Sequence, residues 1–168
     1  MLCNISEHES VRLALSGASA APVLISLLGS HIDEIQSRAA IVLSDMACVD
    51  DNQAVIASLG GIPPLVALLE SELEDVLVNA TNAVRVMCTG NDNNQTLVAE
   101  CGALDPLVEF LGVSLFNSID KSRALFLFVT RFQVSSDILR SAAAAAIAAI
   151  TAGHVANQNR IVDVGAAL

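Results

Sequence analysis

The residues best suited to metal binding or nucleophilic catalysis are the cysteines and histidines, and their spacing fits neither role. Zinc ligands recur at short, fixed intervals, and a nucleophilic thiol needs a histidine placed to activate it. No such interval occurs among Cys3, Cys48, Cys88, Cys101, His8, His31 and His154. We therefore expect no metal site and no cofactor.

Motifs typical of enzymes are also absent. The sequence contains no G-x-x-x-x-G-K-[ST], G-x-S-x-G or H-E-x-x-H pattern. The pair Gly60-Gly61 lacks the following lysine of a phosphate-binding loop, so it is better interpreted as the end of a helix. Cys48 and Cys88 stand beside Met46 and Met87, where small buried thiols are expected. The sequence predicts a protein without catalytic activity.

Composition narrows the class of protein further. The chain has 168 residues, a net charge of −10, 54% hydrophobic residues and only 3% aromatic ones, which favours close-packed helices. The negative charge disfavours nucleic-acid binding. The longest apolar runs, Ala142–Ile150 and Ala124–Thr130, are shorter than the roughly 20 residues of a membrane span. The start of the chain does not read as a secretory signal, so we expect an intracellular protein, either cytoplasmic or nuclear.

An internal repeat gives the strongest indication of the fold. Residues 52–69 recur as residues 94–111, both beginning with Asn-Gln, and the pattern starts again at Asn157. A weaker copy ends at Leu28. A unit of about 40 residues that recurs in this way is typical of helical repeat proteins, whose units stack to complete a core.

Turn and cap residues predict two short helices in each unit. The Asn of each Asn-Gln pair is expected to cap the first helix, and Gly60 or Gly102 to end it. Proline then begins the second helix, at Pro63 or Pro64 and at Pro106. In the first full unit this second helix carries an apolar stripe formed by Leu65, Leu68 and Leu69.

A longer third helix is predicted at Ile35–Met46, Val76–Cys88 and Leu139–Thr151. Small side chains on each third helix would allow neighbouring helices to approach closely. These are Ala39, Ala40, Ala80, Ala83, Ala143 and Ala146.

Together, the Asn-Gln opening, the glycine hinge, the proline start and the alanine-rich third helix resemble the armadillo repeat, over nearly the whole chain. The resemblance implies an all-α, right-handed α-solenoid of ARM-type three-helix repeats. The predicted divisions are the end of a repeat at 1–9, repeats at 10–51, 52–93 and 94–156, and the start of a repeat at 157–168. Because neither end carries a polar capping repeat, we expect either a piece of a longer solenoid or self-association through uncapped ends.

The repeat at 94–156 is interrupted by an insert at about 113–133. The insert combines positive charge with apolar anchors, namely Phe126, Phe128 and Phe132. Two interpretations remain open: an aromatic finger that anchors a partner, or a poorly ordered extra coding segment.

Armadillo proteins commonly bind extended peptides along the concave face formed by their third helices, through a Trp and an Asn four residues later. The matching Trp positions hold Ile41, Asn82 and Ala145, and the Asn positions hold Asn4, Asp45, Val86 and Ala149. Only Asn4 keeps the expected type, so the resemblance disfavours peptide binding by an importin-like asparagine ladder. The candidate groove residues are Arg38, Ile41, Asp45, Asn79, Asn82, Val86, Ala142, Ala145 and Ala149.

An acidic patch is predicted between two helices, formed by Glu70, Glu72, Glu74 and Asp75. It is either a solvated loop or a surface that steers a basic partner. The sequence thus predicts a protein-interaction scaffold whose partner is a protein or peptide. The alternatives are an importin-like adaptor for basic peptides and a fragment of a longer ankyrin-armadillo protein without independent activity.

Overall fold

The computed structural model describes residues 20–111 and 136–166. These residues form helices and turns, with no strand in either range. The elements are α2 (Ala20–Leu28), α3 (Asp33–Met46), α4 (Asp50–Ser58), α5 (Ile62–Ala67), the 3-10 helix η1 (Leu68–Glu70), α6 (Glu74–Cys88), α7 (Asp92–Glu100), α8 (Leu104–Phe110), α10 (Asp137–Thr151) and α11 (Val155–Ala166).

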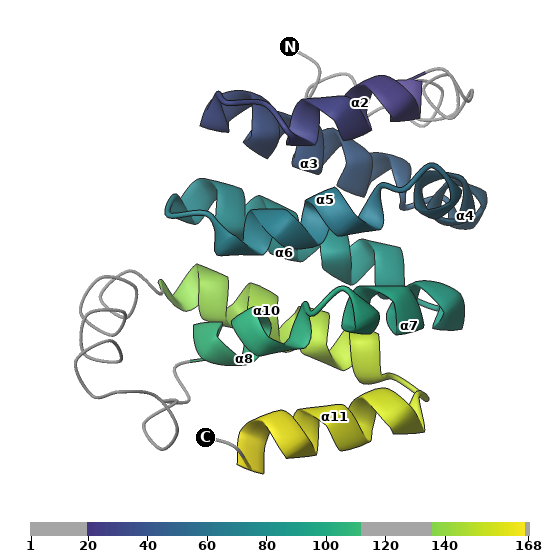
Figure 1. The fold of residues 1–168 in the computed structure, drawn as a ribbon, viewed down its shortest axis with the longest axis vertical. Coiled ribbons are helices and arrows are strands. Elements are labelled where there is room, and N and C mark those ends of the chain that lie inside the picture. The colour runs from purple at the N-terminus through teal and green to yellow at the C-terminus, as the bar shows by residue number, and fades with distance from the viewer. Residues whose placement is uncertain (1–19, 112–135, 167–168) are drawn as a thin grey trace.

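The helices stack in successive units along the long axis of the molecule (Figure 1). The third helices α3, α6 and α10 pack side by side, with α6 in the middle, and form one layer. Helices α2, α5 and α8 pack against this layer, while α4 and α7 lie at one end of their units. The predicted all-α solenoid is therefore confirmed. Of the helices described, none is by itself long and apolar enough to cross a membrane, and the pair Asp50–Ser58 and Ile62–Glu70 meets that test only jointly, across an 89° bend.

The third helices follow the prediction closely. Their last residues, Met46, Cys88 and Thr151, are the predicted ones, and each helix begins two residues earlier than predicted. An acidic residue occupies the first position of each helix and favours helix formation there, because it complements the positive end of the helix dipole. The six predicted small alanines are all buried, which is the condition for close packing of α3, α6 and α10.

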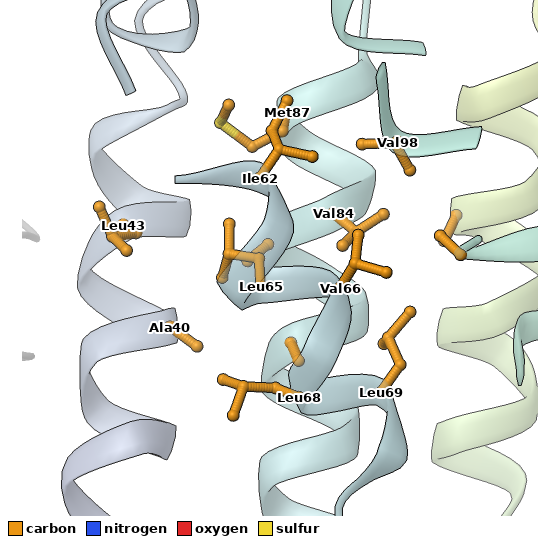
Figure 2. Close-up of a cluster of buried hydrophobic side chains, with 14 of the residues drawn as sticks. Ala40, Leu43, Ile62, Leu65, Val66, Leu68, Leu69, Val84, Met87 and Val98 are labelled. Carbon is orange, nitrogen blue, oxygen red and sulfur yellow. The ribbon is translucent and has the colours of Figure 1, made fainter. Parts of the chain in front are cut away.

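The second helices fill the space beside the third-helix layer. Leu65, Leu68 and Leu69 are all buried, as the apolar stripe predicted. Figure 2 shows Leu65 between Leu43 of α3 and Val84 of α6, so one leucine contributes to the cores of two adjacent units. The leucine-rich pattern thus joins the units, in addition to closing each one.

Glycine ends the short first helices where the sequence predicted it. Gly60 and Gly102 follow α4 and α7 with φ of 76° and 86°, the left-handed conformation that glycine adopts without a steric cost. Gly61 is required for another reason. A Cβ atom there would lie 2.6 Å from Cγ2 of the buried Ile56, so the hinge depends on close approach as well as on backbone freedom.

The predicted capping role of the Asn-Gln asparagines is wrong. Helices α4 and α7 begin two residues before Asn52 and Asn94, so both asparagines lie inside the first turn and are buried. The Asn94 side chain donates to the main-chain carbonyl of Met87 at 2.8 Å, and Asn52 donates to that of Met46 at 2.9 Å. These carbonyls belong to the last turn of the preceding third helix, where acceptors lack intrahelical partners. The asparagines therefore join the end of one helix to the start of the next.

The two cysteines expected to be buried differ from each other. Cys88 is buried at the end of α6, whereas Cys48 is exposed, because it lies beyond the end of α3 rather than within its packed face. Burial raises the pKa of the Cys88 thiol to about 12. The prediction of a buried thiol is thus confirmed for Cys88 and wrong for Cys48.

We expect Cys48 to react with a maleimide at pH 7.5 at least about 100 times faster than Cys88, because Cys48 is exposed, whereas Cys88 is buried and its thiol has a pKa raised to about 12. Mass spectrometry of peptides from briefly labelled protein measures both rates. In denaturing urea the two rates should become equal. Equal rates in the native protein would show that Cys88 is not buried.

Candidate functional site

The candidate groove residues fall at equivalent positions on α3, α6 and α10. They form three rows across the third-helix layer, which we call the first, second and third rung. The first rung is Arg38, Asn79 and Ala142; the second is Ile41, Asn82 and Ala145; the third is Asp45, Val86 and Ala149. Because the three helices pack side by side, the structure brings the residues of each rung onto one layer.

Eight of the nine rung residues remain at least partly exposed. Arg38 and Ala145 are the exposed members, and Ala142 is only 9% exposed, so it adds little to the surface. The rung residues change from two charged side chains and an isoleucine on α3, through two asparagines and a valine on α6, to three alanines on α10. This surface offers hydrogen-bonding groups at one end and a flat apolar face at the other.

Polar side chains on the first rung make hydrogen bonds both within α3 and between α6 and α3. The Asn79 amide on α6 donates to the Ser37 hydroxyl on α3 at 2.8 Å. Arg38 Nε donates to Glu34 at 2.6 Å within α3. Asn82 on the second rung has no side-chain hydrogen bond within the part of the chain described. Its amide is therefore the rung group best placed to satisfy a partner's backbone, since an amide both donates and accepts.

The spacing of the third helices depends on glutamines that the sequence analysis missed as functional positions. The Gln53 amide on α4 donates to the carbonyls of Ala47, at the end of α3, and of Val86, in α6, at 3.2 and 3.0 Å. In the next unit Gln95 donates to the carbonyls of Cys88 and Ala152 at 3.2 and 3.3 Å. Each glutamine thus ties the ends of two successive third helices together. The repeated Asn-Gln pair was the signal for this role.

The two glutamine sites differ in how the amide oxygen is satisfied. The Asn91 amide donates to Gln53 Oε1 at 3.2 Å. The position of Asn91 is taken in the following unit by His154, whose Nε2 instead lies 2.9 Å from the Thr96 hydroxyl. As a result, Gln95 Oε1 is buried without a hydrogen-bond partner in the described ranges. A buried unsatisfied acceptor costs about 1–3 kcal/mol.

Substituting asparagine for His154 is expected to raise the free energy of unfolding by about 1 kcal/mol, because the introduced amide would supply the missing donor to Gln95 Oε1 as Asn91 does for Gln53. Urea denaturation at pH 7.5 measures the change. His31→Asn is the matched control, since His31 is exposed and should leave stability within about 0.5 kcal/mol. A less stable His154→Asn protein would contradict this account of the Gln95 site.

The acidic patch lies around the loop between η1 and α6. Glu70 and Glu72 are exposed, and Glu74 and Asp75 occupy the first turn of α6. Together with Asp33 at the start of α3, Glu70 and Glu72 line an open hollow of about 440 Å³. The patch is thus on the edge of the third-helix layer. The insert anchors Phe126, Phe128 and Phe132 lie outside the described residues, and within those residues no group of His, Cys, Asp and Glu could hold a metal ion.

Comparison with known proteins agrees with this architecture. Residues 50–89, which span α4 to α6, match the model of the Armadillo/beta-catenin-like repeat. This segment matches one armadillo repeat. Over 93 residues, 55% of this chain, it is 40% identical to the ankyrin and armadillo repeat-containing protein of Homo sapiens and 34% identical to that of Mus musculus. The chain spans about 6% of the length of these relatives.

Solved structures extend the likeness to the whole solenoid. An engineered protein matches with a TM-score of 0.77 at 26% identity, over 98% of this chain and 60% of that one. A designed armadillo repeat protein matches with a TM-score of 0.64 at 25% identity, over 98% and 79%. Another designed armadillo repeat protein, in complex with peptide (KR)4, has a TM-score of 0.63 at 22% identity over the same shares and supports the fold alone. The predicted resemblance to armadillo-repeat proteins is confirmed.

Proposed function

We propose that this chain is a non-catalytic protein-interaction scaffold that binds a protein or peptide on the concave surface formed by α3, α6 and α10. The observation that carries the proposal is the alignment of the three rungs on adjacent helices, with eight of nine residues at least partly exposed. A surface of this kind suits an extended or helical segment that crosses the helices.

The chemistry of the rungs favours a segment with mixed properties. Asn82 is suited to pair with a backbone amide, whereas Ala145 and Ala149 form a flat face on which a helix could pack closely. The asparagine positions of an importin-like ladder hold Asp45, Val86 and Ala149, of which the last two cannot hydrogen-bond through their side chains. We therefore infer a partner recognised mainly by shape and apolar contact.

Selection of a phage-displayed peptide library on the full chain tests this proposal. Peptides that bind are then measured by calorimetry against the Ala145→Arg variant, which places a long charged side chain on the second rung. We expect at least a tenfold loss of affinity. The matched control is Ala54→Arg, the same substitution at an exposed alanine of α4. Peptides that bind both variants as tightly as the unaltered chain would contradict binding on the rungs.

A second candidate, an adaptor for basic peptides, is supported by the net charge of −10 and the acidic patch beside the layer. The designed armadillo protein in complex with peptide (KR)4 shows that one member of this fold is found with such a ligand. Salt separates the two candidates, because exposed charge pairs are screened and apolar contacts are not. Affinity that falls sharply between 50 and 300 mM salt favours the adaptor, and affinity that stays constant favours the scaffold.

A further inference from the structure

His154 occupies the N-terminal end of α11 and contacts two elements through its two ring nitrogens. Its Nδ1 accepts a hydrogen bond from the main-chain N–H of Asn157 at 3.3 Å, which caps the first turn of α11. Its Nε2 lies 2.9 Å from the hydroxyl of Thr96 on α7. The same imidazole therefore caps one helix and joins it to another.

The surrounding hydrogen bonds fix the protonation state that this arrangement needs. The Thr96 hydroxyl donates its proton to the main-chain carbonyl of Asp92 at 3.0 Å, so toward His154 its oxygen accepts a hydrogen bond from Nε2–H. Nδ1 is already an acceptor, so it carries no proton. Only the neutral imidazole with its proton on Nε2 satisfies both contacts.

We propose that His154 is a proton-sensitive clamp that holds the start of α11 on α7 and α10. A proton on Nδ1 turns this acceptor into a donor that faces the Asn157 N–H, and it places a positive charge at the unfavourable end of the helix dipole. An imidazole is the side chain that gains a proton closest to neutral pH. Mild acid therefore loosens α11 while the other helices stay in place.

The first turn of α11 is the part of the helix that depends most on this cap. The buried Asn157 amide donates to the carbonyls of Gln95 on α7 and Ile150 on α10, at 3.1 and 3.0 Å. These bonds require the first turn to be helical and correctly placed. Loss of the cap weakens the turn that presents Asn157, and with it the contact between α11 and the preceding unit.

Charged groups on the neighbouring elements modify the response without replacing the cap. They are Asp92 and Glu100 on α7, Asp105 and Glu109 on α8, Asp137 and Arg140 in the first turn of α10, and Arg160 and Asp163 on α11. Asp92, at the first position of α7, attracts an imidazolium and so opposes the opening, whereas Arg160 repels it. The last two turns of α10 contain no titratable side chain. Among the described residues, the acceptor of the Asn157 main-chain N–H is His154 Nδ1.

The preceding unit provides a natural comparison. There Asn91 occupies the equivalent position, and its side-chain oxygen accepts from the Asn94 N–H at 3.1 Å. An asparagine gives the same cap but does not gain a proton in this range. The structure therefore assigns pH sensitivity to α11 and not to α7.

Amide hydrogen exchange of the full chain at pH 7.5 and pH 5.5, expressed as protection factors so that intrinsic rates cancel, tests the proposal. We expect protection of the α11 amides to fall about fivefold to tenfold at pH 5.5, while protection of α7 stays constant. In His154→Asn the fall in α11 should disappear. An equal fall in His154→Asn, or no fall in the unaltered chain, would overturn the proposal.

A second measurement does not depend on the variant. A long-range ¹H–¹⁵N spectrum of the imidazoles at pH 7.5 distinguishes the two neutral tautomers of His154. The clamp requires the proton on Nε2, and a predominant Nδ1–H form would overturn it. Neither experiment uses a binding partner. A result that overturns the His154 proposal therefore does not bear on the proposed scaffold function, which the peptide selection tests separately.

Discussion

Replacing Leu65 with alanine is expected to lower the free energy of unfolding by about 3 kcal/mol, the largest effect among the substitutions considered. Leu65 is only 1% exposed and lies between Leu43 of α3 and Val84 of α6 (Figure 2). Removing most of its side chain leaves a cavity between two units, which cannot collapse without moving a third helix. The loss therefore includes both the transfer free energy of the removed atoms and a cavity term.

Urea denaturation followed by far-ultraviolet circular dichroism measures this change. Leu73→Ala is the matched control, since the same atoms are removed from a side chain that is 46% exposed. We expect the control to lose less than about 1 kcal/mol. Similar losses at Leu65 and Leu73 would contradict the position of Leu65 between the two units.

Asn94→Ala is expected to cost about 2 kcal/mol, because it removes a buried donor and leaves the Met87 carbonyl without its partner. The effect should be larger than that of removing an exposed polar group, which water replaces. It should also appear as greater hydrogen exchange at the end of α6, where the freed carbonyl lies.

The neighbouring residue offers a close control for this substitution. Asn93 lies in the same turn of α7 but is exposed, so Asn93→Ala should change stability by less than about 0.5 kcal/mol. If Asn93→Ala were as destabilising as Asn94→Ala, the loss would reflect a general effect on α7. The account of Asn94 as a link between α6 and α7 would then be wrong.

Much of the fold could be predicted because its determinants are local. The glycines after α4 and α7, the buried leucines of the second helix and the ends of the third helices all follow from residue type and spacing. The starts of α3 and α6 were predicted two residues too late, since Ile32 and Leu73 at their N-cap positions give no capping signal. Acidic residues at the first two positions of α3 and α6 complement the positive end of the helix dipole, so both helices begin two residues before the predicted start.

The errors arose where one helix meets another, whether the two residues are seven apart in sequence, as Asn94 and Met87 are, or 33 apart, as Gln53 and Val86 are. An asparagine before an apolar run is typical of a cap, and only the stacking of α6 above α7 shows that Asn94 instead donates to Met87. The hydrogen bond from the Gln53 amide to the Val86 carbonyl was missed for the same reason. Cys48 was misplaced although the end of α3 was predicted correctly at Met46, because the sequence does not show which residues beyond a helix end pack against a neighbouring element.

The register of neighbouring third helices decides whether the rungs exist, and one contact reports on it directly. The Asn79 side chain donates to the Ser37 hydroxyl at 2.8 Å, joining α6 to α3 across the layer. Nuclear Overhauser spectra of the ¹⁵N,¹³C-labelled chain should therefore show strong cross-peaks between the Asn79 side-chain amide protons and the Ser37 β protons. Cross-peaks from the Asn79 amide to solvent alone, or to another part of α3, would contradict the stacked arrangement on which the proposed binding surface depends.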